Sequence, residues 1–190
     1  LDFEEIISQK EKAHDSVAGL VGRAYYSCDG TEDNPITVTI QNCVNEASVT
    51  GVSSASGQKT AGIVGFVCPN NDYNKVEIKD NVNKGTVRSG GFVSGLALFG
   101  GYNTTKTTKT GISINVEGNE NRGNVYLDVE NGKHITYVAG CASYSGFTLT
   151  ATGNSNSGKA YINNSETTTI LVSSDQNALN ATEKNTAKQA

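Results

Sequence analysis

The sequence predicts an all-β fold, a parallel β-solenoid of about four coils, and two repeated patterns support this prediction. The first is a short head, Ser/Ala-Gly among apolar residues, which recurs around residues 17–22, 60–65, 93–98 and 138–142. The second is an Asn-rich turn that repeats at an interval of 38 residues. A fixed period in this range is typical of solenoids, in which each repeat buries its apolar face only against its neighbours.

The segment before each turn is expected to be a strand. Residues 38–49, 76–87 and 114–125 align position by position, and each begins with two apolar residues separated by one polar residue. This alternation places both apolar side chains on one face of a strand. The Asn-x-Gly or Asn-x-Ala step then turns the chain, because Asn and Gly tolerate the positive φ that tight corners often require.

The repeated asparagines and glycines are interpreted as structural residues. Coils stacked in register place equivalent asparagines about 4.8 Å apart, close enough to hydrogen-bond along the axis. We expect such a ladder from Asn45, Asn83 and Asn121, and we interpret the other turn asparagines, Asn42, Asn81 and Asn119, as ladder residues too. The head glycines are expected to permit close packing of neighbouring backbones; they are Gly19, Gly62, Gly95 and Gly140.

The two ends of the chain differ from the repeats. Residues 1–15 are predicted to form an N-terminal cap, as a short amphipathic helix with acids early and lysines late, which suits the helix dipole. A strand from an incomplete upstream coil is the alternative. The repeat domain covers residues 16–172; its last copy, residues 149–160, is degraded, and 167–172 is a strand that closes the last coil. Residues 173–190 form a polar tail or linker.

An antiparallel β-sandwich is the alternative fold. Each head and turn would then be a hairpin, and the 38-residue period would be an accident.

Bulk composition narrows the possible partners. The 190 residues carry a net charge of −4 and contain no basic patch, which argues against nucleic acid. No apolar run approaches the roughly 20 residues of a membrane helix. The sequence lacks methionine, which indicates a processed chain or a fragment of a longer protein.

Four cysteines are candidates for disulfide bonds: Cys28, Cys43, Cys68 and Cys141. They allow three complete pairings, among which the sequence does not choose. Burial as small apolar side chains is the alternative. Cys43 occupies the position of Asn81 in the next repeat, so the repeat itself does not require a thiol there. The absence of a C-x-x-C pair argues against zinc.

Three sequons mark candidate N-glycosylation sites at Asn103, Asn163 and Asn180. All three fall in polar segments, where a glycan would be accommodated. They matter only in a eukaryotic secreted protein.

Catalytic, cofactor and metal sites are not predicted. The acidic residues are scattered, and the stacking places Asp80 beside Asn42 and Gly118, which is not an acid pair. His14 and His134 lack a nearby nucleophile pattern and are expected to be solvated. The Asp/Asn-rich loops 29–34 and 69–74 suit calcium in ligand type but lack EF-hand spacing, so they are interpreted as solvated loops.

The heads at residues 18–22 and 61–65, each followed by an N-x-G/A-x-V turn, resemble the GLUG-type repeat of bacterial and protist surface proteins. The third head departs from the pattern, since Leu98 replaces its closing glycine, and the fourth is weak. The resemblance covers about residues 17–160. It implies a right-handed parallel β-helix in a large secreted or surface-attached protein, such as an adhesin. It implies no catalytic residue.

The leading hypothesis is therefore a non-enzymatic extracellular module, structural or adhesive, secreted or on the cell surface. Its expected partners are other copies of itself, end to end in an oligomer or surface filament, or a cell-surface protein or glycan. A carbohydrate-binding module or a degraded glycan-active enzyme is the alternative. Tyrosines on one shared face would favour that alternative; the candidates are Tyr25, Tyr26, Tyr73, Tyr102, Tyr126, Tyr137, Tyr144 and Tyr161.

Overall fold

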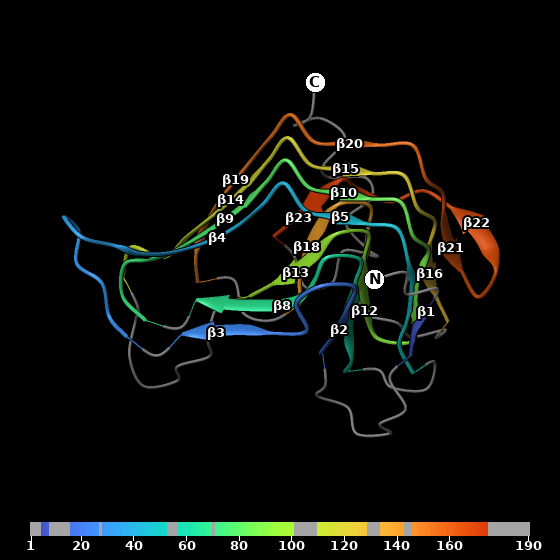
Figure 1. Ribbon diagram of the computed structural model, residues 1–190, viewed down its shortest axis with the longest axis horizontal. Helices are drawn as coiled ribbons and strands as arrows, with labels where there is room; N and C mark the ends of the chain where they lie inside the picture. The colour runs from blue at the N-terminus through green and yellow to red at the C-terminus, as the bar shows by residue number, and fades with distance from the viewer. Residues whose placement is uncertain are drawn as a thin grey trace.

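The computed structural model describes residues 5–7, 16–26, 28–52, 57–69, 71–100, 110–128, 134–142 and 146–174. Within these residues the regular structure is entirely β, and strands from successive coils pair in parallel (Figure 1). This pairing confirms the predicted parallel β-solenoid and excludes the antiparallel sandwich.

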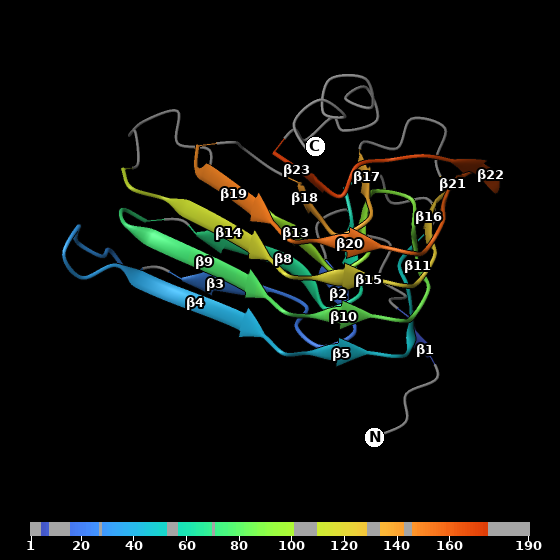
Figure 2. The same ribbon diagram turned by 90° about the horizontal axis from the view of Figure 1, so that it is seen from above.

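Three complete coils follow one another along the chain, and each contributes one strand to each of five sheets (Figure 2). The first consists of β4 (Ile36–Gln41), β5 (Val44–Asn45), β6 (Ser48–Thr50), β7 (Lys59–Ala61) and β8 (Val64–Pro69). The second consists of β9 (Asn74–Lys79), β10 (Val82–Asn83), β11 (Val87–Ser89), β12 (Phe92–Ser94) and β13 (Ala97–Phe99). The third consists of β14 (Ser113–Glu117), β15 (Glu120–Asn121), β16 (Val125–Leu127), β17 (His134–Thr136) and β18 (Ala139–Cys141). Each sheet is named below after its strand from the first complete coil.

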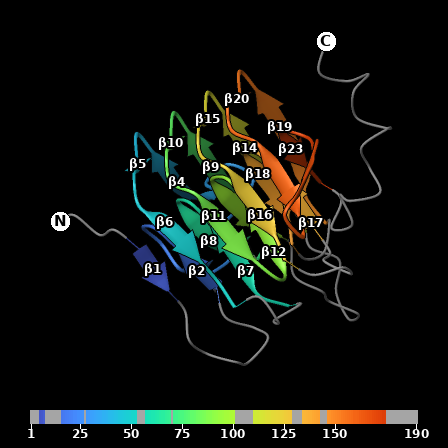
Figure 3. The ribbon, with the colours of Figure 1, turned by 90° about the vertical axis from the view of Figure 1, so that its right-hand side faces the viewer.

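Partial coils lie at both ends. The chain enters through β1 (Glu5–Ile7), β2 (Ser16–Ala18) and β3 (Ala24–Tyr26). It ends with β19 (Thr148–Thr152), β20 (Ser155–Asn156), β21 (Ala160–Ile162), β22 (Ser165–Thr167) and β23 (Val172–Ser173). In the β6 sheet the order is β1, β6, β11, β16, β21, β22. Figure 3 shows the first four of these strands.

Two predictions for the ends need correction. Residues 5–7 form strand β1, which pairs in parallel with β6. For these residues the predicted helix is wrong and the alternative, a strand, is confirmed. The rest of the predicted cap, 1–4 and 8–15, lies outside the described residues. The expected strand over 167–172 is divided: Thr167 ends β22, which runs antiparallel to β21, and Val172 begins β23. Most of the predicted tail, residues 175–190, also lies outside the described residues.

The buried apolar residues of the described part form three clusters, and the two larger ones are layers between facing sheets. The β4 sheet packs against the β8 sheet, and the β6 sheet packs against the β7 sheet (Figure 1). Equivalent side chains stack from coil to coil, as Ile40, Ile78 and Val116 do in the β4 sheet. Such burial contributes roughly 25 cal/mol per Å² of apolar surface and is the main stabilising term.

The heads stack as predicted in the first three copies but not in the fourth. Gly19 donates its N–H to the Gly62 carbonyl at 3.1 Å, and Gly62 does the same to Gly95 at 3.1 Å. Pairing of β12 with β17 then places Tyr137 above Gly95, whereas Gly140 pairs with Leu98. The predicted equivalence of Gly140 with the other head glycines is therefore wrong. Stacking the apolar Ile135 on Val93 decides this register.

The positive φ of each corner also lies at a different position from the predicted one. Asn42, Asp80, Gly118 and Gly153 form a column of left-handed residues, with φ of 55°, 52°, 64° and 64°. Each precedes the Asn of its turn by three residues. Asp80 does lie beside Asn42 and Gly118, as the stacking argument predicts.

Candidate binding cleft on the outer face

The turn asparagines form ladders, so their polar atoms are used within the fold. Asn45 Nδ2 donates to Asn83 Oδ1 at 2.8 Å, Asn83 to Asn121 at 2.9 Å, and Asn121 to Asn156 at 2.8 Å. Each donating amide also binds a backbone carbonyl two residues further on, as Asn83 does with Gly85 at 2.7 Å. These asparagines are structural, as the sequence predicts.

A second ladder runs beside the first. Asn81 Nδ2 donates to Asn119 Oδ1 at 2.9 Å, and Asn119 donates to Asn154 at 3.0 Å. Asn42 is not part of it, because this residue lies in the left-handed column. Cys43 occupies the ladder position instead, and its N–H donates to Asn81 Oδ1 at 3.0 Å.

The outer face of the β6 sheet carries one row of larger side chains. Thr50 pairs with Arg88, Arg88 with Tyr126, and Tyr126 with Tyr161 in adjacent strands. Strand alternation points them outward, since their neighbours Val87, Val125 and Leu127 are buried.

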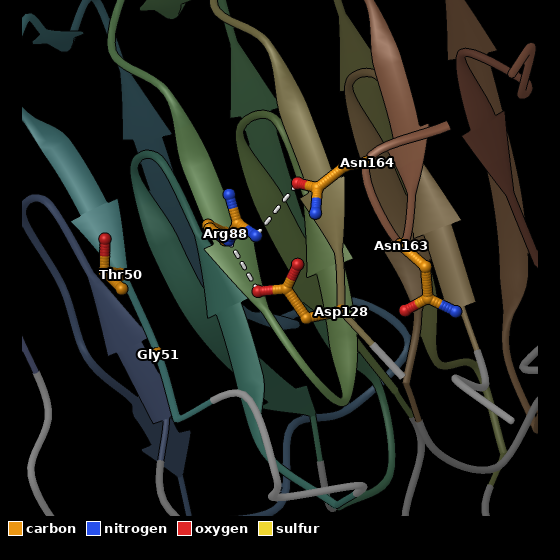
Figure 4. Close-up of a pocket in the computed structure, with 6 residues that line it drawn as sticks. All are labelled: Thr50, Gly51, Arg88, Asp128, Asn163 and Asn164. Atoms are coloured by element: carbon orange, nitrogen blue, oxygen red, sulfur yellow. Dashed lines mark hydrogen bonds and ion pairs between the residues drawn. The ribbon is translucent and has the colours of Figure 1, made fainter. Parts of the chain in front are cut away.

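An open cleft of about 520 Å³ lies along this row (Figure 4). Its lining residues are Thr50, Gly51, Arg88, Asp128, Asn163 and Asn164. These residues come from β6 and the residue after it, from β11, from the segment after β16 and from the turn after β21, so tertiary stacking brings them together.

Arg88 is the central residue of the cleft. Its Nε donates to Asp128 Oδ2 at 2.6 Å and its Nη2 donates to Asn164 Oδ1 at 3.1 Å. Its guanidinium carbon lies 5.2 Å from the centroid of the Tyr126 ring, a cation–π distance. Arginine has five N–H donors, so a fixed guanidinium at 38% exposure keeps donors for a ligand.

Tyr126 and Tyr161 stack on each other beside the cleft. Their ring centroids are 4.5 Å apart and the rings are inclined by 8°. Tyr126 therefore uses one face against Tyr161 and the other against Arg88, which leaves ring edges and hydroxyls for outside contacts. The shared face that would favour carbohydrate binding exists, but Tyr126 does not provide a flat stacking platform.

The turn between β21 and β22 carries one candidate glycosylation site. Asn163 and Asn164 have φ of 48° and 64°, the pattern of a two-residue type I′ hairpin, which Asn tolerates well. Asn163 is exposed at the rim of the cleft. The other two candidates, Asn103 and Asn180, lie outside the described residues.

The cysteines differ in environment. Cys28, Cys43 and Cys68 are free thiols that are exposed, partly buried and buried, respectively. Burial raises the pKa of the Cys68 thiol, against the opposing influence of Arg23 and Lys59. Cys141 is fully buried in the apolar layer between the β4 and β8 sheets. The interpretation as small apolar side chains therefore suits Cys68 and Cys141.

The other candidate groups are used in the fold. Asp29 Oδ1 accepts the Asp72 N–H at 3.3 Å, and Asp72 Oδ1 accepts the Thr110 N–H at 2.8 Å, so both loop carboxylates bind backbone. The described residues contain no group of three or more His, Cys, Asp or Glu placed to hold a metal. The expectation of a solvated His134 is wrong, because this side chain is fully buried with its ring 6.2 Å from that of Phe92. His14 lies outside the described residues.

Comparisons with protein-family models, curated proteins and solved structures found no match to this chain. The resemblance to the GLUG-type repeat therefore stays a prediction. Among the residues that the structure describes, no helix is long and apolar enough to cross a membrane.

Thr50, Arg88, Asp128 and Asn164 are not among the site residues predicted from the sequence. Extending the turn alignment by one residue beyond Val49, Val87 and Val125 gives Thr50, Arg88 and Tyr126, which is the row itself. The signal is therefore present in the sequence. Asp128 and Asn164 have no such periodic signal.

Proposed function

We propose that the chain is a non-enzymatic structural and adhesive β-solenoid module of a secreted or cell-surface protein. The supporting observation is that the polar side chains fall into two sets, one used inside the fold and one gathered on the outer face. The turn asparagines are used in coil-to-coil ladders, whereas the cleft gathers hydrogen-bonding groups on the outer face around a fixed Arg88. The coils thus act as a scaffold and the outer face as a docking surface.

The chemistry of the cleft suits binding better than catalysis. General acid–base catalysis needs a side chain that exchanges a proton near the working pH. Arginine remains protonated in proteins, and Arg88 binds the carboxylate of Asp128 at 2.6 Å. Glycoside hydrolysis usually needs two carboxyl groups, and Asp128 is the single carboxylate among the six lining residues.

An adhesion assay tests this proposal. Beads coated with the purified chain are expected to retain cells or polysaccharide above the level of albumin-coated beads, without releasing new reducing ends from the polysaccharide. Release of reducing ends would make the chain an enzyme. Retention equal to that of albumin-coated beads on every surface would reject adhesion.

A carbohydrate-binding module is the second candidate, and the shared face of Tyr126 and Tyr161 favours it. A glycan array with the Tyr161→Ala variant tests this candidate. Tyr25→Ala is the matched control, because Tyr25 is exposed but belongs to the β8 sheet. Loss of glycan signal in Tyr161→Ala alone supports the module, and equal signals in both variants reject it.

A further inference from the structure

We infer that the outer face of the β6 sheet binds an extended, uncharged polysaccharide that lies along the solenoid axis, across the strands. The inference rests on the proposed adhesive function. It adds the class of ligand, the direction in which the ligand lies and the residues that contact it.

The direction follows from the spacing of the row. Thr50, Arg88, Tyr126 and Tyr161 each come from a successive coil, and neighbouring strands are about 4.8 Å apart. This distance between neighbouring strands is close to the length of one sugar unit in an extended polysaccharide. Successive sugar units therefore meet successive side chains of the row.

The ligand class follows from the polar groups in the cleft (Figure 4). Arg88 supplies N–H donors, Asp128 and the turn asparagines supply acceptor oxygens, and the Thr50 hydroxyl can do both. Neighbouring sugar hydroxyls both donate and accept, so they match such a mixed set. Asp128, Asn164 and Tyr126 fix Arg88 in advance, which lowers the entropic cost of binding.

Charge favours an uncharged polymer. Arg88 is balanced by Asp128 at 2.6 Å, and beyond Tyr161 the exposed Lys159 is balanced by Glu166 at 3.0 Å. The whole chain carries a net charge of −4, so a polyanion is repelled at long range.

The tyrosines act through their hydroxyls. The two rings stack on each other, and the second face of Tyr126 lies against Arg88, so that face is not available to a sugar ring. A Tyr161→Phe change keeps the ring stack and removes only the hydroxyl. It therefore separates a ligand contact from a role in the stack.

The test is affinity electrophoresis of the full chain in gels containing hydroxyethylcellulose, which is neutral and extended, or polygalacturonate, which is anionic. The neutral polymer is expected to retard the protein and the anionic one is not. Arg88→Ala is expected to weaken binding roughly tenfold or more, the effect of losing a hydrogen bond to a charged group. Tyr161→Phe is expected to weaken it several-fold. Lys84→Ala, a change of an exposed residue after β10, is the matched control.

Ligand length gives an independent readout. Calorimetry with glucan oligosaccharides is expected to show affinity rising from one sugar unit to about four, because the row spans four coils. Thermal unfolding checks that each variant folds. Where Arg88→Ala does not fold, Arg88→Lys, which keeps the charge and loses the planar fork, and Thr50→Val take its place.

Several outcomes overturn the inference. These are an Arg88 or Thr50 variant that binds like Lys84→Ala, equal affinity for one and four sugar units, or preference for polygalacturonate. If the coated beads retain cells but the gels show no retardation, polysaccharide binding is rejected and the adhesive function is not. Beads that retain nothing reject the adhesive function itself.

Discussion

At the scale of single residues, Asn83 shows why the fold repeats one amino acid at one position. Its amide accepts from Asn45 and donates to both Asn121 and the Gly85 carbonyl, at 2.7 to 2.9 Å, and the side chain is fully buried. A buried polar group without partners is costly, so only a side chain with both donor and acceptor fits between two like neighbours.

We therefore expect Asn83→Ala to lower the free energy of unfolding by about 2–4 kcal/mol, because it leaves several buried partners unsatisfied. Asn156→Ala is the matched control at the end of the same ladder, where the side chain is only partly buried. Urea unfolding measures both variants. Equal losses would contradict the ladder as the source of the effect.

Close approach of backbones makes Gly95 a sensitive position. A Cβ added there would lie 1.9 Å from the Tyr137 carbonyl oxygen, which belongs to the next coil and cannot move independently. Gly95→Ala is expected to cost about 1–3 kcal/mol, the usual range for overpacking. Gly146→Ala is the control, since nothing lies within 4 Å of its added Cβ. Thermal unfolding that ranks the two variants equally would contradict this expectation.

At the scale of elements, ion pairs on the surface connect neighbouring strands and turns. Lys84 follows β10 and binds Glu46, the equivalent position after β5, at 2.6 Å. Within β15 and its turn, Arg122 binds Glu120 at 2.6 Å. The hydrogen bond from Lys84 lowers the pKa of Glu46, and that from Arg122 lowers the pKa of Glu120.

These shifts predict a dependence of stability on pH. A carboxyl whose pKa is lower in the folded chain stabilises the fold above its ordinary value of 4.5, and this contribution is lost as the pH falls through the folded value. Glu46 is exposed and Glu120 is partly exposed, so the effect is small and decreases with salt. Urea unfolding between pH 6 and pH 3 is expected to show a shallower slope for Glu46→Gln than for the unchanged chain. An identical slope would mean that the pair does not form in solution.

At the scale of the whole molecule, burial rises from the ends toward the central coils. Leu20, Ile63, Leu96, Val138 and Leu171 occupy one stack joined by backbone hydrogen bonds of 2.8 to 3.3 Å. Ile63, Leu96 and Val138 are fully buried, but Leu20 in the entering partial coil is 52% exposed. A solenoid covers each coil with the next, so the end coils lack one neighbour.

This gradient predicts that one substitution has different costs along a single stack. Leu96→Ala is expected to cost about 2–5 kcal/mol, the range for a large core side chain. Leu20→Ala is expected to cost about 1 kcal/mol or less, because half of the side chain is exposed in the folded chain. Urea unfolding with both variants checks this, and a cost at Leu20 equal to that at Leu96 would show that another element covers this end.

The exposed ends also bear on assembly. β4 and β5 are edge strands of their sheets, and unpaired edges favour association with another chain. At the other end, however, β22 occupies the edge of the β6 sheet and runs antiparallel. A filament of stacked copies stays a prediction, and its contact would have to accommodate this hairpin.

Periodicity alone determined much of the architecture. Buried side chains must match their neighbours in the next coil, so the 38-residue interval, the Asn ladders and the apolar pairs of the β4 sheet are all readable from the sequence. Where the 38-residue interval is not kept, predictions from the repeat are wrong. Gly140 has the right local pattern but pairs with Leu98, because the apolar contact of Ile135 with Val93 sets the register.

The cleft was decided by tertiary structure. Arg88 meets Asp128 and Asn164, which are 40 and 76 residues away in the chain. Outward-facing side chains do not have to match an apolar neighbour in the next coil. No periodic pattern in the sequence therefore shows which of them lie together in the cleft. Only the pairing of the strands and the position of the β21–β22 hairpin bring these groups to one face. The fold, in contrast, can be predicted from the sequence, because apolar and amide side chains must be buried against equivalent residues of the next coil.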